Sequence, residues 1–263
     1  MSINTYSYVT ETPGSFATKE QLSMILTRYN LAKKYCENKD VLEVACGSGI
    51  GISYLNEIAK SVSACDIDST LVNITKNNIK NIENVDVKVG DAQNLPYLDK
   101  SFDVVIIFEA IYYLDDFKKF LDEANRVLRA EGLIIISSVN PEWHGFNPSP
   151  FSTKYFNLDE LNSFSNSLLP FKNLCSFYGY NNKINYSNFL ISIIKILAVK
   201  LNIMPKTMSG KKILKKIFLG KLYTIPNHID DKMCKLEKLI LSTKILTSEK
   251  KNFKQIYTVL KKK

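Results

Sequence analysis

The sequence of residues 41–51 is VLEVACGSGIG, and the fold follows from this stretch. Its first five residues form an apolar run of a length typical of a buried strand, interrupted by one acid, Glu43. Three glycines then occur at every second position, and apolar residues return with helical spacing from Ile52 onward. This pattern predicts a strand, a tight turn and a helix whose first backbone N–H groups face whatever lies over the turn.

The spacing of the acid and the glycines is more specific than a glycine-rich turn alone. Glu43 stands four residues before the first glycine, at the predicted carboxyl end of the strand, where ligands of open α/β sheets bind. The pattern E-x-x-x-G-x-G-x-G resembles the first motif of class I S-adenosylmethionine-dependent methyltransferases of type 11. In that family the turn wraps the methionine part of the cofactor. The resemblance implies that Glu43, Ala45, Gly47 and Gly49 bind the cofactor.

A second acid follows in the order that this family shows. Asp66 comes at the end of a short apolar strand, and the resemblance implies that its carboxylate accepts hydrogen bonds from the cofactor's ribose diol, with Ile67 beside it. Asp68 is a rival for this role. We assign it instead to capping a helix over residues 69–79.

A third motif, GDAQNLP at residues 90–96, resembles the family segment that holds adenine. The resemblance implies that Asp91 accepts from the exocyclic amine and that the backbone N–H of Ala92 faces a ring nitrogen. The alternative is that Asp91 only forms a turn. The position of the motif, third in the expected order, favours the binding role.

Residues 101–109 predict a fourth strand, apolar throughout its middle and therefore buried on both faces. In the family, residues just after this strand border both cofactor and acceptor. The resemblance therefore implies cofactor contacts for Phe108 and Glu109, and a place in the acceptor pocket, with a catalytic role, for Tyr113 or its neighbour Tyr112.

An amphipathic helix is predicted over residues 19–37, where family members often have a helix that covers the cofactor. Tyr29 would then face the sulfonium through cation–π attraction. The alternative is that Tyr29 packs in the core and Arg28 faces solvent.

Five successive units of strand followed by helix or turn predict a parallel sheet with right-handed crossovers. Residues 171–180 predict a sixth strand, and residues 252–260 fit the antiparallel seventh strand of the family. We expect an α/β fold, a seven-stranded, doubly wound, mostly parallel sheet of the Rossmann-like methyltransferase type. The domain would comprise residues 1–180 plus 252–263, with residues 181–251 as a helical insertion between strands six and seven.

This insertion concentrates the positive charge of the chain. It holds fifteen lysines and four acids between Lys183 and Lys251, whereas the whole chain has a formal net charge of +9. Apolar stripes predict helices over residues 189–204, 211–219 and 230–242. One interpretation is a packed helical cap with solvated lysines, and the other is a surface for phosphorylated acceptors or an anionic membrane, contacted through residues 187–220. Specific nucleic-acid binding is disfavoured because this segment lacks arginine.

Residues 140–152, NPEWHGFNPSPFS, hold the chain's only tryptophan together with three prolines. Prolines stiffen a loop and aromatic residues make walls, so we expect a rigid lip over the carboxyl edge of the sheet. His144 is our first candidate for a catalytic base, and the alternative is a histidine that only packs or orients the loop. The string is similar to ones in methyltransferases of surface-polysaccharide and glycan clusters.

Composition is that of an ordinary globular protein of 263 residues, with 45% hydrophobic and 23% charged residues. The five cysteines have no metal-binding or redox spacing, which indicates reduced thiols. Neither a signal peptide nor an apolar run of about 18 residues is evident. We expect a cytoplasmic protein without a metal site.

These features together predict S-adenosylmethionine-dependent methyl transfer to a hydroxyl or amine of a small acceptor. We expect a sugar or a phosphorylated or nucleotide-linked metabolite of surface-polysaccharide biosynthesis. DNA adenine is disfavoured because Asn140-Pro141 does not continue as the Pro-Tyr of adenine methylating enzymes. The alternatives are a lipid or quinone acceptor at a membrane surface, and a cofactor-binding module without catalysis.

Overall fold

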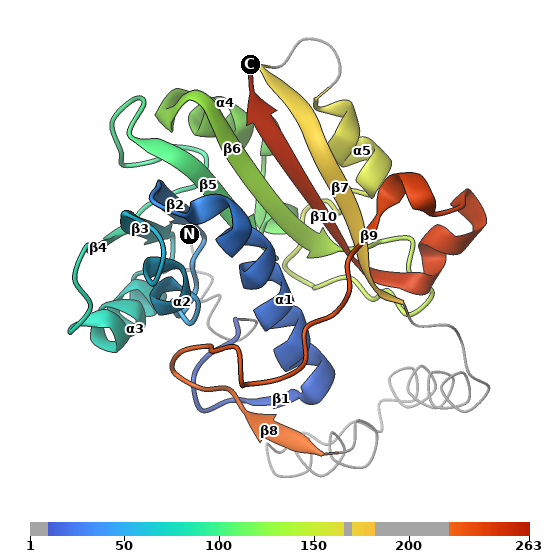
Figure 1. The fold of residues 1–263 in the computed structure, drawn as a ribbon, viewed down its shortest axis with the longest axis horizontal. Coiled ribbons are helices and arrows are strands. Elements are labelled where there is room, and N and C mark those ends of the chain that lie inside the picture. Colours follow the sequence, from blue (N-terminus) through green and yellow to red (C-terminus); the bar gives the residue numbers. More distant parts are fainter. Residues whose placement is uncertain (1–9, 166–169, 182–220) are drawn as a thin grey trace.

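The computed structural model describes residues 10–165, 170–181 and 221–263. Its centre is an eight-stranded sheet in the order β4-β3-β2-β5-β6-β10-β7-β9 (Figure 1). The five strands from β4 to β6 in this order are parallel, whereas β10 runs antiparallel to both of its neighbours. The strands are β2 (Asp40–Val44), β3 (Ser61–Asp66), β4 (Val85–Val89), β5 (Phe102–Phe108), β6 (Leu128–Val139), β7 (Phe171–Asn181), β9 (Ile240–Leu241) and β10 (Phe253–Lys262).

The predicted mostly parallel sheet is therefore confirmed, together with an antiparallel last strand beside the sixth. The predicted count of seven strands is not, because β9 adds a two-residue strand along the outer edge of β7. Strand β10 lies between β6 and β7, so the end of the chain completes the middle of the sheet.

Helices begin where the sequence supplies caps. Thr18 forms a capping box with Gln21 at the start of α1, and the Asp68, Asp116 and Asn157 side chains cap α3, α4 and α5. The helices are α1 (Lys19–Cys36), α2 (Ile52–Asn56), α3 (Ser69–Ile79), α4 (Phe117–Val127) and α5 (Leu158–Ser163). None of the helices in the described ranges is long and apolar enough to cross a membrane.

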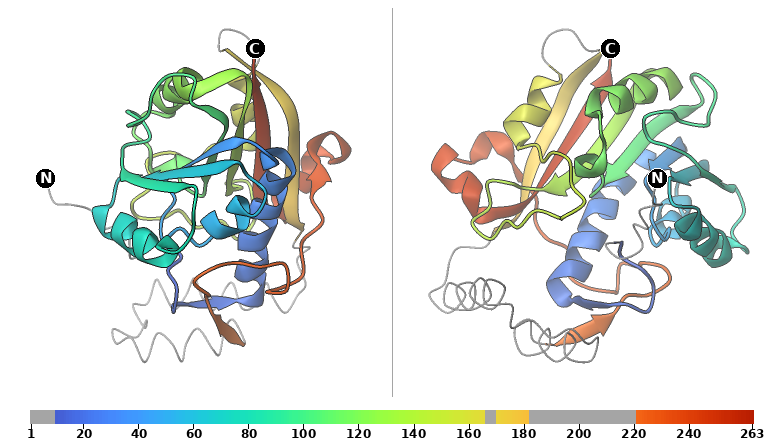
Figure 2. Two further views of the ribbon diagram at one scale, coloured as in Figure 1. Left: turned by 60° about the vertical axis from the view of Figure 1, so that its left-hand side comes forward. Right: turned by 180° about the vertical axis from the view of Figure 1, so that it is seen from behind.

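The sheet is covered on both faces (Figure 2). On one face α1, α2 and α3 pack against alternate residues of the central strands, such as Val41 and Val104. On the other, α4 and α5 pack against the residues between them, such as Leu42 and Val105. Two-sided burial explains why β5 is apolar from Val104 to Phe108. The helices thus hold the strands from both sides.

The described end of the predicted insertion differs from our expectation. Residues 231–234 form a turn, residues 235–239 lead without helix into β9, and the helix predicted over residues 230–242 is wrong. The backbone of this segment bonds to α1: Ser23 Oγ donates to the Lys235 carbonyl at 2.7 Å, and the Glu237 N–H donates to Thr27 Oγ1 at 3.0 Å. These bonds satisfy polar groups that a helix would otherwise pair internally. The two other predicted helices, at residues 189–204 and 211–219, lie outside the described residues.

An earlier part of the predicted insertion, residues 222–225, pairs with the first described residues. Strand β8 (Leu222–Thr224) pairs antiparallel with β1 (Phe16–Thr18) in a separate two-stranded sheet. Two further bonds extend this pairing, from the Gly14 N–H to the Ile225 carbonyl at 2.9 Å and from the Ile225 N–H to the Ser15 carbonyl at 2.8 Å. Residues 10–15, which we call the N-terminal arm, are thereby held beside the carboxyl ends of the strands.

Candidate active site

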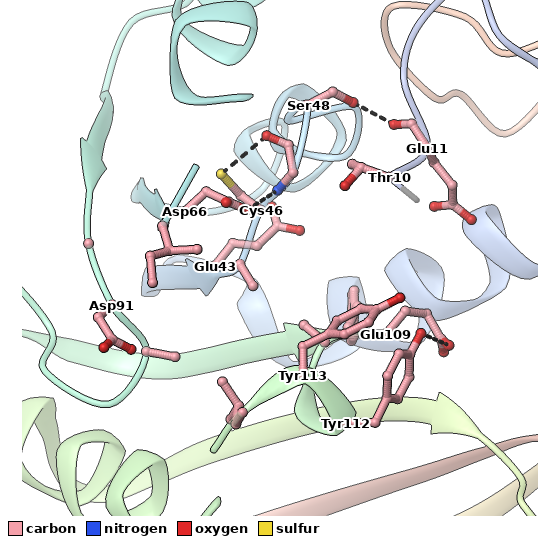
Figure 3. Close-up of a pocket in the computed structure, with 18 of the residues that line it drawn as sticks. Thr10, Glu11, Glu43, Cys46, Ser48, Asp66, Asp91, Glu109, Tyr112 and Tyr113 are labelled. Carbon is pink, nitrogen blue, oxygen red and sulfur yellow. Dashed lines mark hydrogen bonds between the residues drawn. The ribbon is translucent and has the colours of Figure 1, made fainter. Parts of the chain in front are cut away.

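A cavity of about 340 Å³ opens at the carboxyl ends of β2, β3 and β5. Its walls come from the N-terminal arm, α1, the turn after β2, the loop after β4 and the residues that follow β5. Figure 3 shows the side chains of Asp66 and Asp91 toward one end, and those of Glu109, Tyr112 and Tyr113 toward the other. Segments that are distant in sequence therefore share one cavity, as the topology of an open parallel sheet requires.

The turn after β2 has the backbone that its glycines predict. Gly49 has φ of 69°, and a Cβ atom placed on it would lie 2.4 Å from Thr75 Cγ2. Gly51 leaves room for an aromatic ring, because a Cβ there would lie 2.0 Å from Tyr29 Cε1. Gly47 lines the cavity and Gly49 does not, so the role of Gly49 is to shape the turn.

Glu43 lies beneath this turn and is only 2% exposed. The Tyr29 hydroxyl donates to its Oε1 atom at 2.5 Å, while its Oε2 atom is buried without a partner in the described structure. Burial raises the pKa of the Glu43 carboxyl to about 7. A buried carboxylate with one unsatisfied oxygen on a cavity wall is suited to a cationic ligand. Ala45 also lines the cavity, with φ of 55°.

Asp66 joins the turn to β3. Its Oδ2 atom accepts from the Gly47 N–H at 2.8 Å and its Oδ1 atom accepts from the Asp68 N–H at 2.9 Å. Each oxygen keeps a second lone pair for a hydroxyl in the cavity. Asp68 caps α3 by accepting from the Thr70 N–H at 2.8 Å, as expected. The preference for Asp66 over its rival therefore agrees with the geometry.

Asp91 and Ala92 line the same end of the cavity, as does Ile67, whose side chain is 57% exposed. Asp91 Oδ1 accepts from the Gln93 N–H at 2.8 Å, so the turn-forming role also exists. The two roles are compatible, because this bond uses only one of the two carboxylate oxygens.

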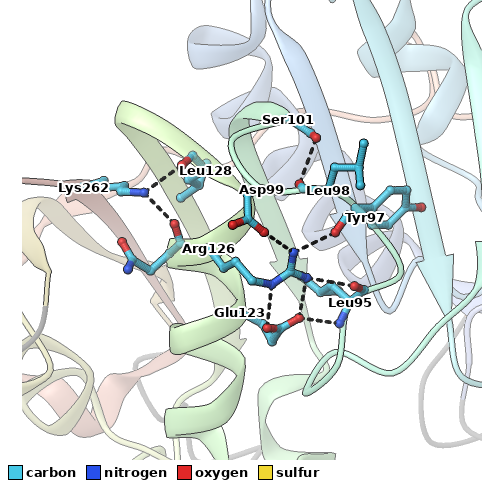
Figure 4. A network of polar contacts seen from close by, with 10 residues as sticks. Leu95, Tyr97, Leu98, Asp99, Ser101, Glu123, Arg126, Leu128 and Lys262 are labelled. Atoms are coloured by element: carbon cyan, nitrogen blue, oxygen red, sulfur yellow. Dashed lines mark hydrogen bonds and ion pairs between the residues drawn. The ribbon is translucent and has the colours of Figure 1, made fainter.

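The loop that carries Asp91 is fastened to α4 by Arg126 (Figure 4). The guanidinium donates to the carbonyls of Leu95 at 3.0 Å and Tyr97 at 2.8 Å. It also forms a two-point contact with Glu123, at 2.8 and 2.7 Å, and Glu123 in turn accepts from the Leu95 N–H at 2.7 Å. This network closes the loop over residues 95–99 and so fixes the position from which residues 91 and 92 reach the cavity.

At the other end, Glu109 follows β5 with φ of 52°. Its two oxygens accept from Ser137 Oγ at 3.3 Å and from the Tyr112 hydroxyl at 3.4 Å. Burial raises the pKa of the Glu109 carboxyl to about 7. Phe108 packs edge-on against the Tyr29 ring, with centroids 5.2 Å apart, so both predicted aromatic residues lie in the wall.

Several lining residues were not predicted as parts of the site, among them Glu11, Arg28 and Ser48. Arg28 was considered only as a solvated side chain, yet it is 6% exposed and forms an ion pair with Glu11 of the N-terminal arm. Ser48 Oγ also donates to the Glu11 carbonyl, at 2.7 Å, so the arm is tied to the glycine turn as well. The signal available in the sequence was an arginine next to Tyr29 on an apolar helical stripe, where burial of the tyrosine brings the arginine with it.

His144 does not line the cavity, and the structure offers no support for our first choice of base. His144 is exposed, and its backbone N–H donates to the Lys251 carbonyl at 3.1 Å. The cause is the buried Asn140, which donates from Nδ2 to the carbonyls of Lys250 at 2.9 Å and Phe253 at 2.8 Å and so turns the loop toward β10. The histidine follows this turn away from the cavity.

The later part of the same loop does reach the cavity wall. The Tyr155 ring stacks on Tyr112 with centroids 4.5 Å apart, and the Tyr113 hydroxyl donates to Ser149 Oγ at 3.4 Å. The predicted lip therefore supports the two tyrosines from behind. Tyr113 itself lines the cavity, as expected.

Comparison with known proteins agrees with this geometry. Residues 42–136 match the family model described as a methyltransferase domain. This part of the chain is similar to a methyltransferase domain. A probable S-adenosylmethionine-dependent methyltransferase of Mycobacterium tuberculosis is 37% identical to it over 134 residues, which are 49% of this chain and 47% of that protein. The fatty-acid O-methyltransferase of Mycolicibacterium smegmatis is 33% identical over 147 residues, 52% of this chain and 53% of that protein.

A phthiotriol/phenolphthiotriol dimycocerosates methyltransferase of Mycobacterium tuberculosis is 38% identical over 105 residues, 39% of this chain and 38% of that protein. This chain thus spans about half the length, or less, of the curated relatives it matches. The residues that the family model matches contain the glycine turn, Asp66, Asp91 and Glu109. The family match agrees with the predicted kind of domain, and the first of these relatives is named as dependent on S-adenosylmethionine.

Two of the solved structures with a similar fold illustrate the likeness. A possible histamine N-methyltransferase from Thermotoga maritima has a TM-score of 0.59 at 16% identity, covering 93% of this chain and 92% of that one. The [4+2]-cyclase SpnF also has a TM-score of 0.59, at 14% identity, covering 98% of this chain and 90% of that one. At these identities the likeness concerns the fold alone.

The Arg126 network makes a first prediction. Arg126→Ala should lower the free energy of unfolding by about 1–3 kcal/mol, because the Leu95 and Tyr97 carbonyls lose charged donors. Arg126→Lys should recover only part of this loss, since lysine lacks the planar fork. Urea denaturation measures the effect, and Lys119→Ala on the exposed face of α4 is the matched control, expected within about 0.5 kcal/mol of the original chain. An Arg126→Ala chain as stable as this control would contradict the role.

The raised pKa of the Glu43 carboxyl makes a second prediction. A folded-state pKa of about 7, above the ordinary 4.5, means that the folded chain binds more protons than the unfolded chain in this window. Stability should therefore fall as pH rises from about 4.5 to about 7, by up to ~3 kcal/mol for this group. Thermal melting of the ligand-free chain at pH 5 and pH 8 should show a smaller difference for Glu43→Gln. The exposed Glu83→Gln should keep the original difference, and an unchanged slope in Glu43→Gln would refute the assignment.

Proposed function

We propose that this chain transfers the methyl group of S-adenosylmethionine to a hydroxyl of a small acceptor. The observation that carries the proposal is the single cavity in which Glu43, Asp66 and Asp91, from three separate segments, face one space that continues to Glu109. A binding site for one elongated molecule with a second molecule at its end needs this arrangement.

The residues present fit the cofactor. Glu43 has a buried oxygen without a partner in the described residues, which suits a cationic group, and Asp66 keeps free lone pairs for a diol. Asp91 and Ala92 would hold adenine at the far end, next to Ile67. When bound, the cofactor supplies a methyl group already activated by a sulfonium.

Alignment is then the main task of the protein. Holding donor and acceptor in line is worth up to about 7–11 kcal/mol of the barrier. The glycine turn, tied to Asp66, fixes one side of the cavity. The N-terminal arm, tied to Arg28 and Ser48, covers the turn and limits the access of water.

The charge of the cavity bears on the acceptor. Among the described residues that line it, six are acids and only Arg28 is a cation. This excess of negative charge disfavours a phosphorylated acceptor, which we had expected together with a sugar, and favours a neutral one. The lysines of residues 183–220 lie outside the described residues and lend no support to phosphate binding.

A lipid acceptor is the second candidate, and the names of the relatives favour it. Two of them are named as methyltransferases of fatty acids and of phthiotriol or phenolphthiotriol dimycocerosates. A neutral sugar of surface-polysaccharide synthesis remains our hypothesis from the proline-rich lip. We also propose peripheral contact with a membrane and a cytoplasmic location.

Cofactor binding tests the first part. Calorimetry should show binding of S-adenosylmethionine and S-adenosylhomocysteine. Asp66→Ala should raise the Kd of both by about 10- to 100-fold, because hydrogen bonds to a charged group are lost. Asp86→Ala, an exposed aspartate on β4, is the control and should bind normally. Circular dichroism checks that both variants fold. Absence of binding to the original chain would end the proposal.

Turnover tests the second part. Release of S-adenosylhomocysteine should be measured with neutral sugars, nucleotide sugars, long-chain alcohols and fatty acids, the last two with and without detergent. Turnover of a neutral alcohol or sugar supports methyl transfer to a hydroxyl. Tight cofactor binding without turnover of any acceptor would instead favour the non-catalytic module.

A further inference from the structure

The backbone of Glu109 has an unfavourable conformation that the surrounding structure must stabilise. Glu109 is the first residue after β5, and its φ of 52° lies in the left-handed region. This backbone conformation costs free energy in residues other than glycine. Its N–H donates to the Ser137 carbonyl at 3.0 Å, so pairing with β6 continues through this residue. The conformation places the carboxylate on the cavity wall beside Tyr112 and Tyr113 (Figure 3).

The contacts of this carboxylate orient it without neutralising it. Both donors, Ser137 Oγ at 3.3 Å and the Tyr112 hydroxyl at 3.4 Å, are uncharged, and both bonds are long. In the described part of the chain no ion pair reaches Glu109, and the nearby Arg28 is paired with Glu11. The carboxylate therefore keeps acceptor capacity for a group inside the cavity.

The surrounding charges set its proton affinity. Burial and the Glu11 carboxylate raise the pKa of Glu109, whereas Arg28, Ser137 and Tyr112 lower it, and the result is about 7. Tyr113 and, from β10, Tyr257 are the other titratable groups that face it, and both stay neutral near pH 7 because burial raises the pKa of each phenol. A base that is half ionised at neutral pH is well matched to general base catalysis.

We propose that Glu109 is the general base of the reaction: it accepts the proton of a neutral acceptor hydroxyl held between its carboxylate and Tyr113. The inference rests on the proposed function and narrows it to alcohols. It also moves Glu109 from the cofactor-binding role that the sequence suggested to the acceptor side of the cavity.

The step balances in atoms and in charge. An oxygen lone pair of the acceptor forms the new bond to the methyl carbon, the carbon–sulfur bond breaks, and its electron pair stays on sulfur. The acceptor's proton passes to a Glu109 oxygen. One positive and one negative charge disappear together, so no net charge is created in a cavity where charge is poorly solvated.

The proposal separates alcohols from carboxylic acids. A fatty acid is already ionised at neutral pH, needs no base, and would meet the carboxylates of Glu11 and Glu109. This protein should therefore methylate a long-chain alcohol faster than the fatty acid of equal chain length, and a sugar hydroxyl faster than that fatty acid, whatever the relatives act on.

Kinetics of Glu109→Gln test the role, with the best acceptor of the turnover panel. We expect kcat to fall by about 10²–10⁴-fold, while the Kd for S-adenosylhomocysteine stays within about threefold. The original chain should lose rate as pH falls through about 7, and this limb should vanish in the variant. Glu109→Asp should recover part of the rate, and Glu83→Gln should match the original chain in every measurement.

The outcomes are distinct. A Glu109→Gln chain that keeps kcat within about threefold, or that keeps the acid limb, overturns the proposal, and so does a fatty acid turned over faster than its alcohol. Loss of S-adenosylhomocysteine binding in a folded Glu109→Gln chain returns the residue to the cofactor side. Binding of cofactor by the original chain without turnover of any acceptor refutes the proposed function itself, and this inference with it.

Discussion

The hydrogen bond from the Gly47 amide to the Asp66 carboxylate holds the site together. It joins the turn after β2 to the end of β3, the strand that pairs with β2. With this bond made, the turn closes over Glu43, and Asp66 itself faces the cavity. The N-terminal arm then rests on a turn that is already fixed, through the contact between Ser48 and Glu11. The rest of the cavity is assembled around this pair of segments.

Charge is distributed in the cavity so that each acid has a different environment. Asp66 receives two backbone N–H groups, Glu43 receives one phenol, and Glu109 receives two uncharged hydroxyls. Among the described residues that line the cavity, Glu11 is the one acid in an ion pair. The carboxylates can therefore serve in different roles even though they line one space, because local donors decide how readily each gives up or takes a proton.

The elements that sequence predicted well are those in which short-range pattern and burial agree. The strand and turn at residues 41–51, the cap of α3 and the two-sided burial of β5 are all determined by neighbours in the chain. Asp66 and Asp91 could be placed because the carboxyl ends of parallel strands must meet at one edge. His144 could not, because its position depends on Asn140 bonding to Lys250 and Phe253, more than a hundred residues later. Arg28 and residues 230–242 were mistaken for the same reason: an apolar stripe does not reveal that its polar groups will be satisfied by a partner segment.

Tyr29 and Gly51 occupy one volume between them, since the ring fills the space that a Cβ on Gly51 would need. The same ring presents the hydroxyl that Glu43 accepts from. Positions 29, 43 and 51 thus form a unit that evolution can alter only in concert: a larger residue at 51 expels the ring, and its departure strips Glu43 of its donor. Divergent descendants of this chain should therefore either retain all three residues or exchange them together.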